Sequence, residues 1–153
     1  MPVTCRTAIP SDAETLHDLR RRSILKLAPK GMSVRRAREW AARGSVKSMH
    51  RRLEQTEAWV AEVEGEIVGW IAVRGDYVDG LYVDPGYTKR GIGAHLLRLV
   101  EGVLRGRGSQ AIHADASWNS EGFYMRQGYE PLGPRPPNAA RPMRKVLLNE
   151  RAG

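Results

Sequence analysis

The sequence predicts a mixed α/β fold in which a central, mostly antiparallel sheet is flanked by helices. The first observation is the order of segments: a strand, two or three helices, three strands, a helix, a strand, a helix and two strands. The second is a hairpin signal at Glu64-Gly65, between two runs of apolar residues. The third is a glycine-containing loop that joins a strand to an amphipathic helix. A doubly wound parallel protein does not place an antiparallel hairpin here, so we disfavour that class.

Length and composition predict one domain that spans residues 1–153. The chain is 41% hydrophobic and 27% charged, which is typical of a globular protein with a sizeable core. No apolar run approaches the roughly 20 residues of a membrane span. Residues 1–6 lack a signal-peptide core, and Cys5 is the single cysteine, so no internal disulfide forms. We expect a cytoplasmic protein with no membrane partner and no metal. A homodimer is left open.

The N-terminal third is predicted to hold one strand and three helical segments. Ser11 is the expected N-cap of the first helix, and Glu14, three residues later, completes a capping box. Pro29-Lys30-Gly31 is expected to end this helix. The strand is expected at residues 3–8, and the helical segments between Pro10 and Gly31, between Ser33 and Gly44, and at residues 46–55.

The rest of the chain is predicted to hold six strands and two helices. On the first of these helices the apolar residues repeat at helical spacing, whereas Arg98, Glu101 and Arg105 are expected on the opposite, polar face. The predicted strands are 59–63, 67–73, 77–83, 111–115, 129–132 and 143–148, and the helices are 92–104 and 119–127.

The positive charge is concentrated in the N-terminal third. Residues 1–56 hold 13 Lys and Arg against 5 Asp and Glu, which equals the whole net charge of +8. A positive field attracts acidic substrates, acidic protein surfaces or nucleic acid. A solvated helical face that aids solubility is the alternative. The sequence therefore leaves open whether this charge selects an acidic acceptor.

The loop after residue 83 is typical of an anion-binding site. A strand-like run ends at Val83, Lys89 and Arg90 follow, and Gly91 and Gly93 stand at the start of the helix. Glycine lets the backbone approach a ligand closely. The first turn of a helix presents unpaired N–H groups at the positive end of the helix dipole. Together these features favour a phosphate group. A glycine-rich turn into a surface helix is the alternative.

Two other phosphate-binding motifs do not fit this loop. A P-loop needs Gly-Lys-Ser/Thr, but Gly93 is followed by Ala94-His95. The dinucleotide fingerprint requires a third glycine where this chain has Leu96. Its first glycine should also follow the strand directly, whereas residues 84–90 intervene here. Only Asp115, about twenty residues further on, agrees with the fingerprint. Neither motif therefore explains this loop.

Residues 81–85 and 90–94 resemble the central motif of the GNAT superfamily of acetyl-CoA-dependent N-acetyltransferases. The family pattern is Gln/Arg-x-x-Gly-x-Gly/Ala, and the two glycines, the basic residue before them and the following helix all match. This chain has Thr88 where Gln or Arg is usual and Lys89 at a position that is commonly small. The order of predicted elements is also that of the GNAT fold, so the resemblance covers nearly the whole chain.

A second motif lies about thirty residues downstream of the first. Residues 116–129, Ala-Ser-Trp-Asn-Ser-Glu-Gly-Phe-Tyr-Met-Arg-Gln-Gly-Tyr, are similar to the GNAT segment Ala-Ser-x-Asn-Ala-x-x-Phe-Tyr-x-x-x-Gly-Phe. Tyr124 falls on the family tyrosine, and Gly128-Tyr129 on the Gly-Phe pair. Ordinary core aromatics on a helix are the alternative for Phe123 and Tyr124. Two motifs in the right order are more specific than either alone.

The resemblance implies direct acetyl transfer from acetyl-CoA to a primary amine, without a covalent acyl-enzyme. It implies a splay between the strands near 77–83 and 111–115 for the pantetheine arm, and a bulge around 81–83 that exposes an amide to the oxyanion. Tyr124 is the expected general acid, since a hydroxyl with a pKa of about 10 stays protonated at neutral pH. Asn119 or Ser117 would bind the pantetheine arm. The expected cofactor-binding residues are Leu81, Tyr82, Val83, Thr88, Lys89, Arg90, Gly91, Ile92, Gly93, Ala94, Asn119 and Tyr124.

The acceptor amine must lose a proton before it attacks, since its unperturbed pKa is about 10.4. Asp79 is the expected base, and strand alternation puts it on the face of Leu81 and Val83. His113 and Asp115 share one face of the next strand and are further candidates, as is a chain of water molecules. Three tryptophans could line an acceptor pocket or pack in the core: Trp40, Trp59 and Trp70.

Two other functions compete with an N-acetyltransferase. A nucleic-acid-binding module could use the basic runs at 20–22 and 35–38, but it lacks helix-turn-helix spacing and leaves both later motifs unexplained. A non-catalytic CoA-binding sensor would not need Tyr124. We therefore favour an enzyme whose acceptor is a small-molecule amine or a protein amine, and expect from the charge that this acceptor is acidic.

Overall fold

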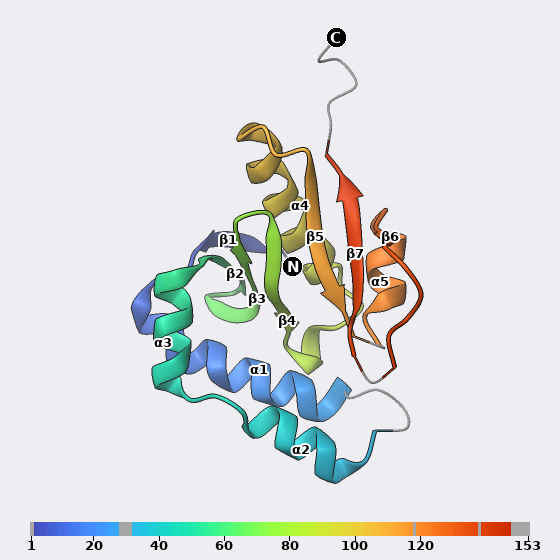
Figure 1. The fold of residues 1–153 in the computed structure, drawn as a ribbon. Coiled ribbons are helices and arrows are strands. Elements are labelled where there is room, and N and C mark those ends of the chain that lie inside the picture. Colours follow the sequence, from blue (N-terminus) through green and yellow to red (C-terminus); the bar gives the residue numbers. More distant parts are fainter. Residues whose placement is uncertain (1, 28–31, 118, 138, 148–153) are drawn as a thin grey trace.

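The computed structural model describes residues 2–27, 32–117, 119–137 and 139–147 (Figure 1). In this part of the chain seven strands form one sheet in the order β1-β2-β3-β4-β5-β7-β6, in which β4 and β5 are parallel and all other neighbours are antiparallel. The predicted mixed α/β fold with a mostly antiparallel sheet is confirmed. The strands are β1 (Thr4–Thr7), β2 (Glu57–Val63), β3 (Glu66–Arg74), β4 (Tyr77–Val83), β5 (Ala111–Ala116), β6 (Glu130–Pro131) and β7 (Arg141–Val146).

Helices cover both faces of the sheet. Helix α4 packs on one face, where its apolar stripe meets the inward side chains of β2, β3 and β5 in the larger core cluster. Helices α1 and α3 cover the other face around Trp70, and α2 packs beside α1 (Figure 1). The helices are α1 (Ala13–Leu27), α2 (Val34–Ala42), α3 (Val46–Gln55), α4 (Ile92–Gly106) and α5 (Glu121–Arg126), with short 3₁₀ turns η1 (Pro10–Asp12) and η2 (Pro85–Tyr87).

The N-terminal helices begin and end close to the expected positions, with one correction. Ser33 caps α2 by accepting the N–H of Arg36, and α3 has the predicted bounds. Ser11 is not the N-cap of α1, because a 3₁₀ turn precedes the helix and Ser11 lies within it. The carboxylate that reaches back is that of Asp12 rather than Glu14: it accepts the N–H of Ile9, the N-cap residue of the turn, at 2.8 Å and binds Arg6 of β1. The expected stop at Pro29-Lys30-Gly31 lies outside the described residues.

The β2–β3 hairpin turns at Glu64 and Gly65, as predicted. Both residues have positive φ angles, 51° and 81°, which is the geometry of a type I′ turn and explains the Glu-Gly sequence. Strand β4 has the predicted bounds. Helix α5 is shorter than expected, and β7 begins two residues earlier than expected, at Arg141.

A β-bulge in β4 changes which face its side chains occupy. Ala72 pairs with Gly80 and Val73 pairs with Val78, so Asp79 is the extra residue. The bulge was expected around Leu81 to Val83, and it lies just before them. One inserted residue shifts the alternation by one, so Asp79 does not share the face of Leu81 and Val83 as predicted. It lies on the opposite face, where it meets α3.

Strands β4 and β5 separate after a short parallel ladder. Their register pairs are Tyr77–His113 and Val78–Ala114, whereas β4 stays paired with β3 as far as Val83. The predicted splay between the strands near 77–83 and 111–115 is therefore confirmed. It leaves one edge of β4 without a strand partner next to the start of α4.

Candidate active site

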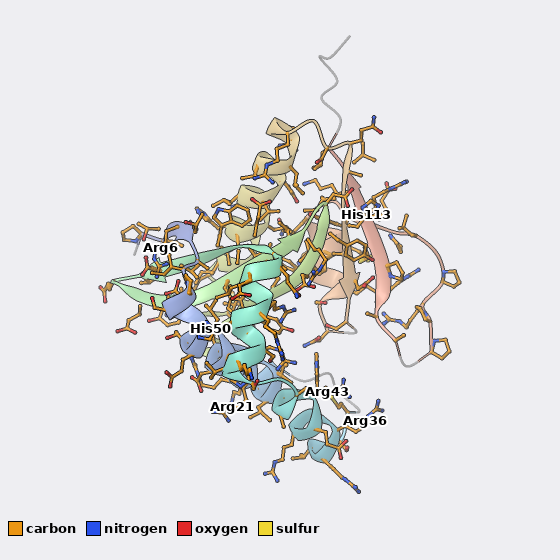
Figure 2. All side chains as sticks on the ribbon, turned by 60° about the vertical axis from the view of Figure 1, so that its left-hand side comes forward. Arg6, Arg21, Arg36, Arg43, His50 and His113 are labelled. Carbon is orange, nitrogen blue, oxygen red and sulfur yellow. The ribbon has the colours of Figure 1, made fainter. Side chains whose placement is uncertain are left out.

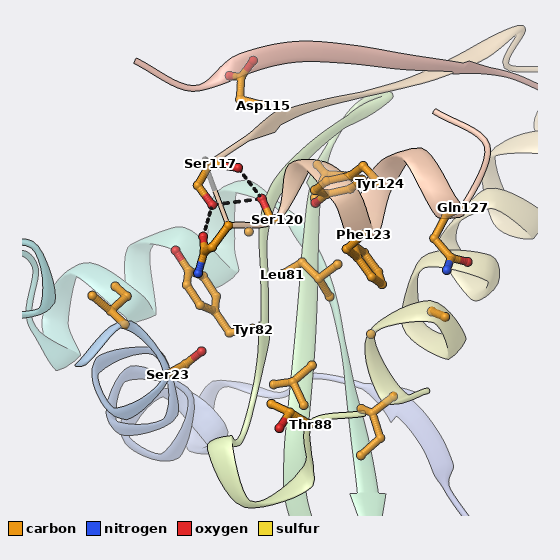
Figure 3. A pocket seen from close by; sticks show the side chains of 18 of the residues that line it. Ser23, Leu81, Tyr82, Thr88, Asp115, Ser117, Ser120, Phe123, Tyr124 and Gln127 are labelled. Carbon is orange, nitrogen blue, oxygen red and sulfur yellow. Dashed lines mark hydrogen bonds between the residues drawn. The ribbon is translucent and has the colours of Figure 1, made fainter. Parts of the chain in front are cut away.

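A cavity of about 810 Å³ occupies the splay and extends to both sides of it. Figure 3 shows Phe123 and Tyr124 of α5 facing Leu81 of β4, with Ser23 and Tyr82 toward the opposite end. Every residue expected to bind the cofactor lines this cavity except Arg90. The guanidinium of Arg90 lies 5.0 Å from the ring centroid of Tyr87 instead. The structure therefore brings together residues from both sequence motifs.

The open edge of β4 presents backbone amides to this cavity. Asp84 donates its N–H to the carbonyl of Val68 on β3 at 2.8 Å, and Val83 faces Gly69 in the same register. Hydrogen bonding alternates along an antiparallel pair, so Leu81 and Val83 turn their N–H and C=O groups away from β3 and toward the splay. These groups can pair with an extended ligand or hold an oxyanion.

The start of α4 forms the other side of the cavity. Gly91 caps the helix with φ +76°, a left-handed conformation that glycine adopts without strain. Lys89 also has a positive φ, 65°, which explains why a small residue would be easier at this position. The first intrahelical bond runs from His95 N–H to Gly91 O. The N–H groups of residues 92–94 therefore have no helical acceptor, and they are free to bind an anion.

Gly93 lies at a close approach between α4 and α5. A Cβ atom added there would lie 3.4 Å from Cζ of Phe123 and 3.6 Å from Cγ2 of Val83. These are ordinary contact distances, so a methyl group would fit at this point. Any longer side chain has to extend into the cavity or displace Phe123.

Tyr124 is buried at the base of the cavity with 5% of its surface exposed. Its ring makes edge-to-face contacts with Phe123 and Tyr129, at centroid distances of 5.2 and 5.3 Å. Burial raises the pKa of the Tyr124 hydroxyl, and the nearby Tyr82 and Asp115 raise it further because a tyrosinate would face their negative charge. The hydroxyl therefore stays protonated at neutral pH, which is the state of a proton donor.

A buried ionic network holds the aromatic residue next to Tyr124. The hydroxyl of Tyr129 donates to Glu101 at 2.7 Å, and Lys145 of β7 donates to the same carboxylate at 3.0 Å. The expectation that Glu101 lies on the polar face of its helix is wrong, since only 3% of it is exposed. Its partners come from 28 and 44 residues further along the chain. No local pattern could have found this network.

Asp79 forms ion pairs with two arginines on the face of the sheet that the N-terminal helices cover. Arg52 of α3 donates to its carboxylate at 2.6 Å and to its backbone carbonyl at 2.5 Å, and Arg74 lies 3.8 Å away. The same Arg52 guanidinium stacks over Trp70, 5.3 Å from the ring centroid. The carboxylate lines the cavity, but its charge is already compensated.

Asp115 lies on the same face of the sheet as Asp79 but has a different partner. Ile112, Ala114 and Ala116 of β5 point into the core beneath α4, so His113 and Asp115 face the other way, as predicted. The hydroxyl of Tyr77 donates to Asp115 at 2.8 Å, and the Tyr77 ring stacks on His113. Burial and this hydrogen bond raise the pKa of Tyr77 to about 12.

The segment between β5 and α5 is ordered by its own polar side chains. The hydroxyl of Ser117 donates to the side-chain oxygen of Asn119 at 2.8 Å and lies 2.9 Å from the hydroxyl of Ser120 (Figure 3). All three residues line the cavity. They can hydrogen-bond a ligand as expected, and they also fix the entry of the chain into α5.

The N-terminal third contributes few residues to the cavity. Ser23, Ile24 and Trp40 line it, whereas Trp59 and Trp70 are buried in the core. Among the described residues of 1–56, no Lys or Arg lines the cavity. Figure 2 shows the labelled Arg21 and Arg36 at the outer side of the helical layer. The basic character of this third therefore does not reach the cavity wall.

Over residues 2–27, 32–117, 119–137 and 139–147, no group of three or more His, Cys, Asp or Glu is arranged to hold a metal ion. Within the same residues, no helix has the length and hydropathy to cross a membrane.

Comparison with known proteins gives consistent matches. A family model described as an acetyltransferase (GNAT) domain matches residues 25–141. The chain is 27% identical over 128 residues to the uncharacterized N-acetyltransferase YafP of Escherichia coli, covering 84% of this chain and 81% of that protein. It superposes on a GCN5-related N-acetyltransferase from Rhodopseudomonas palustris with a TM-score of 0.88 and 26% identity, over 95% of this chain and 96% of that one. PaiA N-acetyltransferase from Thermoplasma acidophilum, solved with coenzyme A, matches with a TM-score of 0.83 and 21% identity, over 95% and 99% of the two chains.

Proposed function

The chain belongs to the GNAT family of acetyltransferases, and from this premise we propose that it transfers the acetyl group of acetyl-CoA directly to a primary amine. The family uses acetyl-CoA. The comparisons confirm the predicted family, its fold and the prediction that the protein is a transferase. The acceptor class and the role of each residue belong to the proposal.

One observation carries the proposal: three chemically distinct groups meet in a single cavity. The open edge of β4 offers the amides of Leu81 and Val83, the start of α4 offers unpaired N–H groups, and Tyr124 offers a protonated hydroxyl. A thioester with a pyrophosphate tail needs a hydrogen-bonding partner for its extended arm, an anion site and a proton donor. The cavity supplies all three within about 810 Å³.

The residues around α4 are proposed to hold the cofactor. The N–H groups of residues 92–94 and the ammonium group of Lys89 bind the pyrophosphate, since both present positive charge to the same wall of the cavity. Thr88 borders the same space, whereas Tyr82 packs on the opposite face of the sheet and Arg90 lies over the ring of Tyr87. The edge of β4 pairs with the pantetheine arm, and Ser117 and Asn119, which lie between β5 and α5, contact the arm from the other side.

The amides of Leu81 and Val83 and the Tyr124 hydroxyl are proposed to act in the chemical step. Acetyl-CoA supplies a thioester carbonyl whose carbon accepts the amine. As the amine attacks, negative charge grows on the carbonyl oxygen, and a fixed backbone N–H of β4 stabilises it without reorganisation. The departing sulfur takes the proton of Tyr124, whose raised pKa keeps the hydroxyl loaded before each turnover.

The proton of the acceptor amine is proposed to leave through the other end of the cavity. Asp79 lies there, but its carboxylate is held by Arg52 at 2.6 Å. Arg52 and Arg74 already flank this carboxylate, so its oxygens are engaged by the protein. Water in the open end of the cavity is the better acceptor, and Asp79 as the base stays a prediction.

A steady-state assay tests this proposal. The protein is mixed with acetyl-CoA and single amines, free thiol is followed with a chromogenic reagent, and the N-acetyl product is identified by mass. The proposal expects thiol release that depends on the amine and equals the acetylated product. Coenzyme A binding with no amine-dependent release across aliphatic amines, amino acids and lysine peptides would refute it and favour a sensor.

A further inference from the structure

The charged side chains of the cavity are separated between its two ends. Lys89 lies in the loop before α4 and Arg126 lies on α5, both beside the proposed pyrophosphate site. Asp79 and Asp115 lie on the face of the sheet that points away from α4. The cofactor end is therefore lined by positive charge, and the opposite, acceptor end is lined by negative charge.

The two carboxylates at the acceptor end are not equivalent. Asp79 is paired with Arg52 and Arg74. Asp115 accepts a hydrogen bond from the neutral Tyr77 hydroxyl at 2.8 Å. Arg144 of β7 shares the face of Asp115 by register, yet among the described residues no Lys or Arg lies within 4.0 Å of the Asp115 carboxylate. Asp115 is therefore an oriented and uncompensated negative charge on the cavity wall.

Aromatic rings surround the same end of the cavity. Trp40 of α2, Tyr77 and Tyr82 line it together with Asp115. The faces of such rings attract cations, by about 0.5–1 kcal/mol where the ring is exposed. Tyr82 already lies 5.9 Å from the guanidinium of Arg20 and one face of Tyr77 stacks on His113, which leaves Trp40 and the other face of Tyr77 to a ligand. A carboxylate among aromatic faces is a surface that recognises an organic cation.

The basic residues nearest to this end are already engaged by other groups of the protein. Arg20 donates to the carbonyls at the C-terminal end of α2, namely those of Trp40, Ala41 and Arg43. Arg22 binds Asp18 and Asp84, at 2.8 and 2.9 Å. These contacts remove the reason for expecting an acidic acceptor. The positive charge of residues 1–56 is used within the helical layer or faces solvent.

We propose that Asp115, oriented by Tyr77, binds a second, non-reacting positive charge of the acceptor, and that the acceptor is accordingly a diamine or polyamine. This inference rests on the proposed function of the same cavity. The bound charge is not the reacting amine, because a carboxylate beside that amine would favour its protonated form and suppress attack. Tyr124 lies on the α4 side of the sheet and Asp115 on the other, so one acceptor can reach between them with its two ends.

Three amines of equal length test the acceptor class. The value of kcat/KM is measured for 1,4-diaminobutane, n-butylamine and 4-aminobutyrate, which carry a positive, a neutral and a negative far end. The proposal expects the diamine to exceed n-butylamine by about tenfold, the size of a hydrogen-bonded ion pair at a partly exposed site, with 4-aminobutyrate lowest. The preference should weaken with added salt, since the Debye length falls from about 10 Å at 0.1 M to about 3 Å at 1 M.

Substitutions assign the effect to Asp115. In Asp115→Asn the ratio of the diamine to n-butylamine should fall close to one, and Tyr77→Phe should lower it partially. Asp76→Asn is the matched control: it removes the same charge from a neighbouring exposed residue that does not line the cavity, and the ratio should persist. Calorimetry with coenzyme A on each variant checks that the cofactor end is intact.

The failure of this inference and of the proposed function are distinguishable. A diamine that is turned over no better than n-butylamine, or not at all, overturns the inference, and so does a ratio that survives in Asp115→Asn. Thiol release with any other amine would in that case still support N-acetyl transfer.

Discussion

Replacing Gly93 with aspartate tests the anion site at the start of α4. The Cβ position has room, with its nearest neighbour 3.4 Å away, and the carboxylate beyond it extends into the cavity. Aspartate also suits the first turn of a helix, where its charge opposes the helix dipole favourably. The fold of Gly93→Asp should therefore persist while the cavity gains a negative charge beside the proposed pyrophosphate site.

The magnitude follows from Coulomb's law. Two unit charges about 4 Å apart repel by about 1 kcal/mol in water and by about 4 kcal/mol at an effective dielectric constant of about 20. At 1.4 kcal/mol per tenfold, coenzyme A should bind between about fivefold and a thousandfold more weakly.

Isothermal titration calorimetry with coenzyme A measures this effect directly. Gly93→Ala is the control, because it adds the same Cβ without the charge, and its Kd should stay within about threefold of wild type, as an ordinary contact implies. Equal Kd values for wild type and Gly93→Asp would refute an anion site at this helix start. Equal losses in both variants would mean that packing against Phe123, rather than charge, explains the effect.

Four further predictions follow from the same structure. Tyr124→Phe should bind coenzyme A normally but lose about 10²-fold in kcat, and an unchanged kcat would contradict the assigned role. Burial raises the pKa of Tyr124, so the wild-type rate should rise with pH as the amine deprotonates and should not fall near pH 10. Glu101→Ala should lower the free energy of unfolding by about 2–4 kcal/mol in chemical denaturation, because it leaves the Tyr129 hydroxyl and Lys145 without their acceptor. Lys145→Met should cost a similar amount, because it leaves the buried Glu101 carboxylate without its positive partner. The hydrogen bonds from Arg6 lower the pKa of Asp12, so the stability they add is present above the pKa of the unfolded state and is lost as the pH falls through the pKa of the folded state. The free energy of unfolding of Asp12→Asn should therefore fall less than that of the wild type on acidification, and parallel curves for the two proteins would contradict this. Neutralising Arg35, Arg36 and Arg38 together should leave the preference among 1,4-diaminobutane, n-butylamine and 4-aminobutyrate unchanged, since none of them lines the cavity, and a shift toward the cationic amine would restore the acidic-acceptor interpretation.

The parts that the sequence predicts well are those with short-range signals. The Glu64-Gly65 turn, the cap at Ser33 and the start of α4 after Gly91 each depend on residues within one turn of chain. The apolar runs of β2 and β3, which are buried on both faces, and the apolar stripe of α4 set the layers of the fold. Residues of both motifs line one cavity, as the shared cofactor site implied by the family resemblance requires.

The parts that could not be predicted depend on contacts between distant segments. The bulge at Asp79 reverses the face of that residue, and only the register with β3 reveals it. Glu101 occupies a polar position by periodicity, yet β6 and β7 bring Tyr129 and Lys145 over it. The sequence suggests that the arginines of the N-terminal helices are free to attract an acidic ligand, but tertiary packing pairs several of them with groups of the protein. A count of charges along the chain therefore could not reveal that the acceptor end is lined by carboxylates.

One rapid-quench experiment tests whether the acetyl group passes directly from acetyl-CoA to the amine within this cavity. The protein is mixed with excess acetyl-CoA, stopped at times shorter than one turnover, and analysed by intact-protein mass with and without 1,4-diaminobutane. The account predicts an unmodified protein mass in both cases, and N-acetyl-diaminobutane that appears at the same rate as coenzyme A. A protein that gains one acetyl group before the product forms, and loses it when the amine is added, would contradict direct transfer.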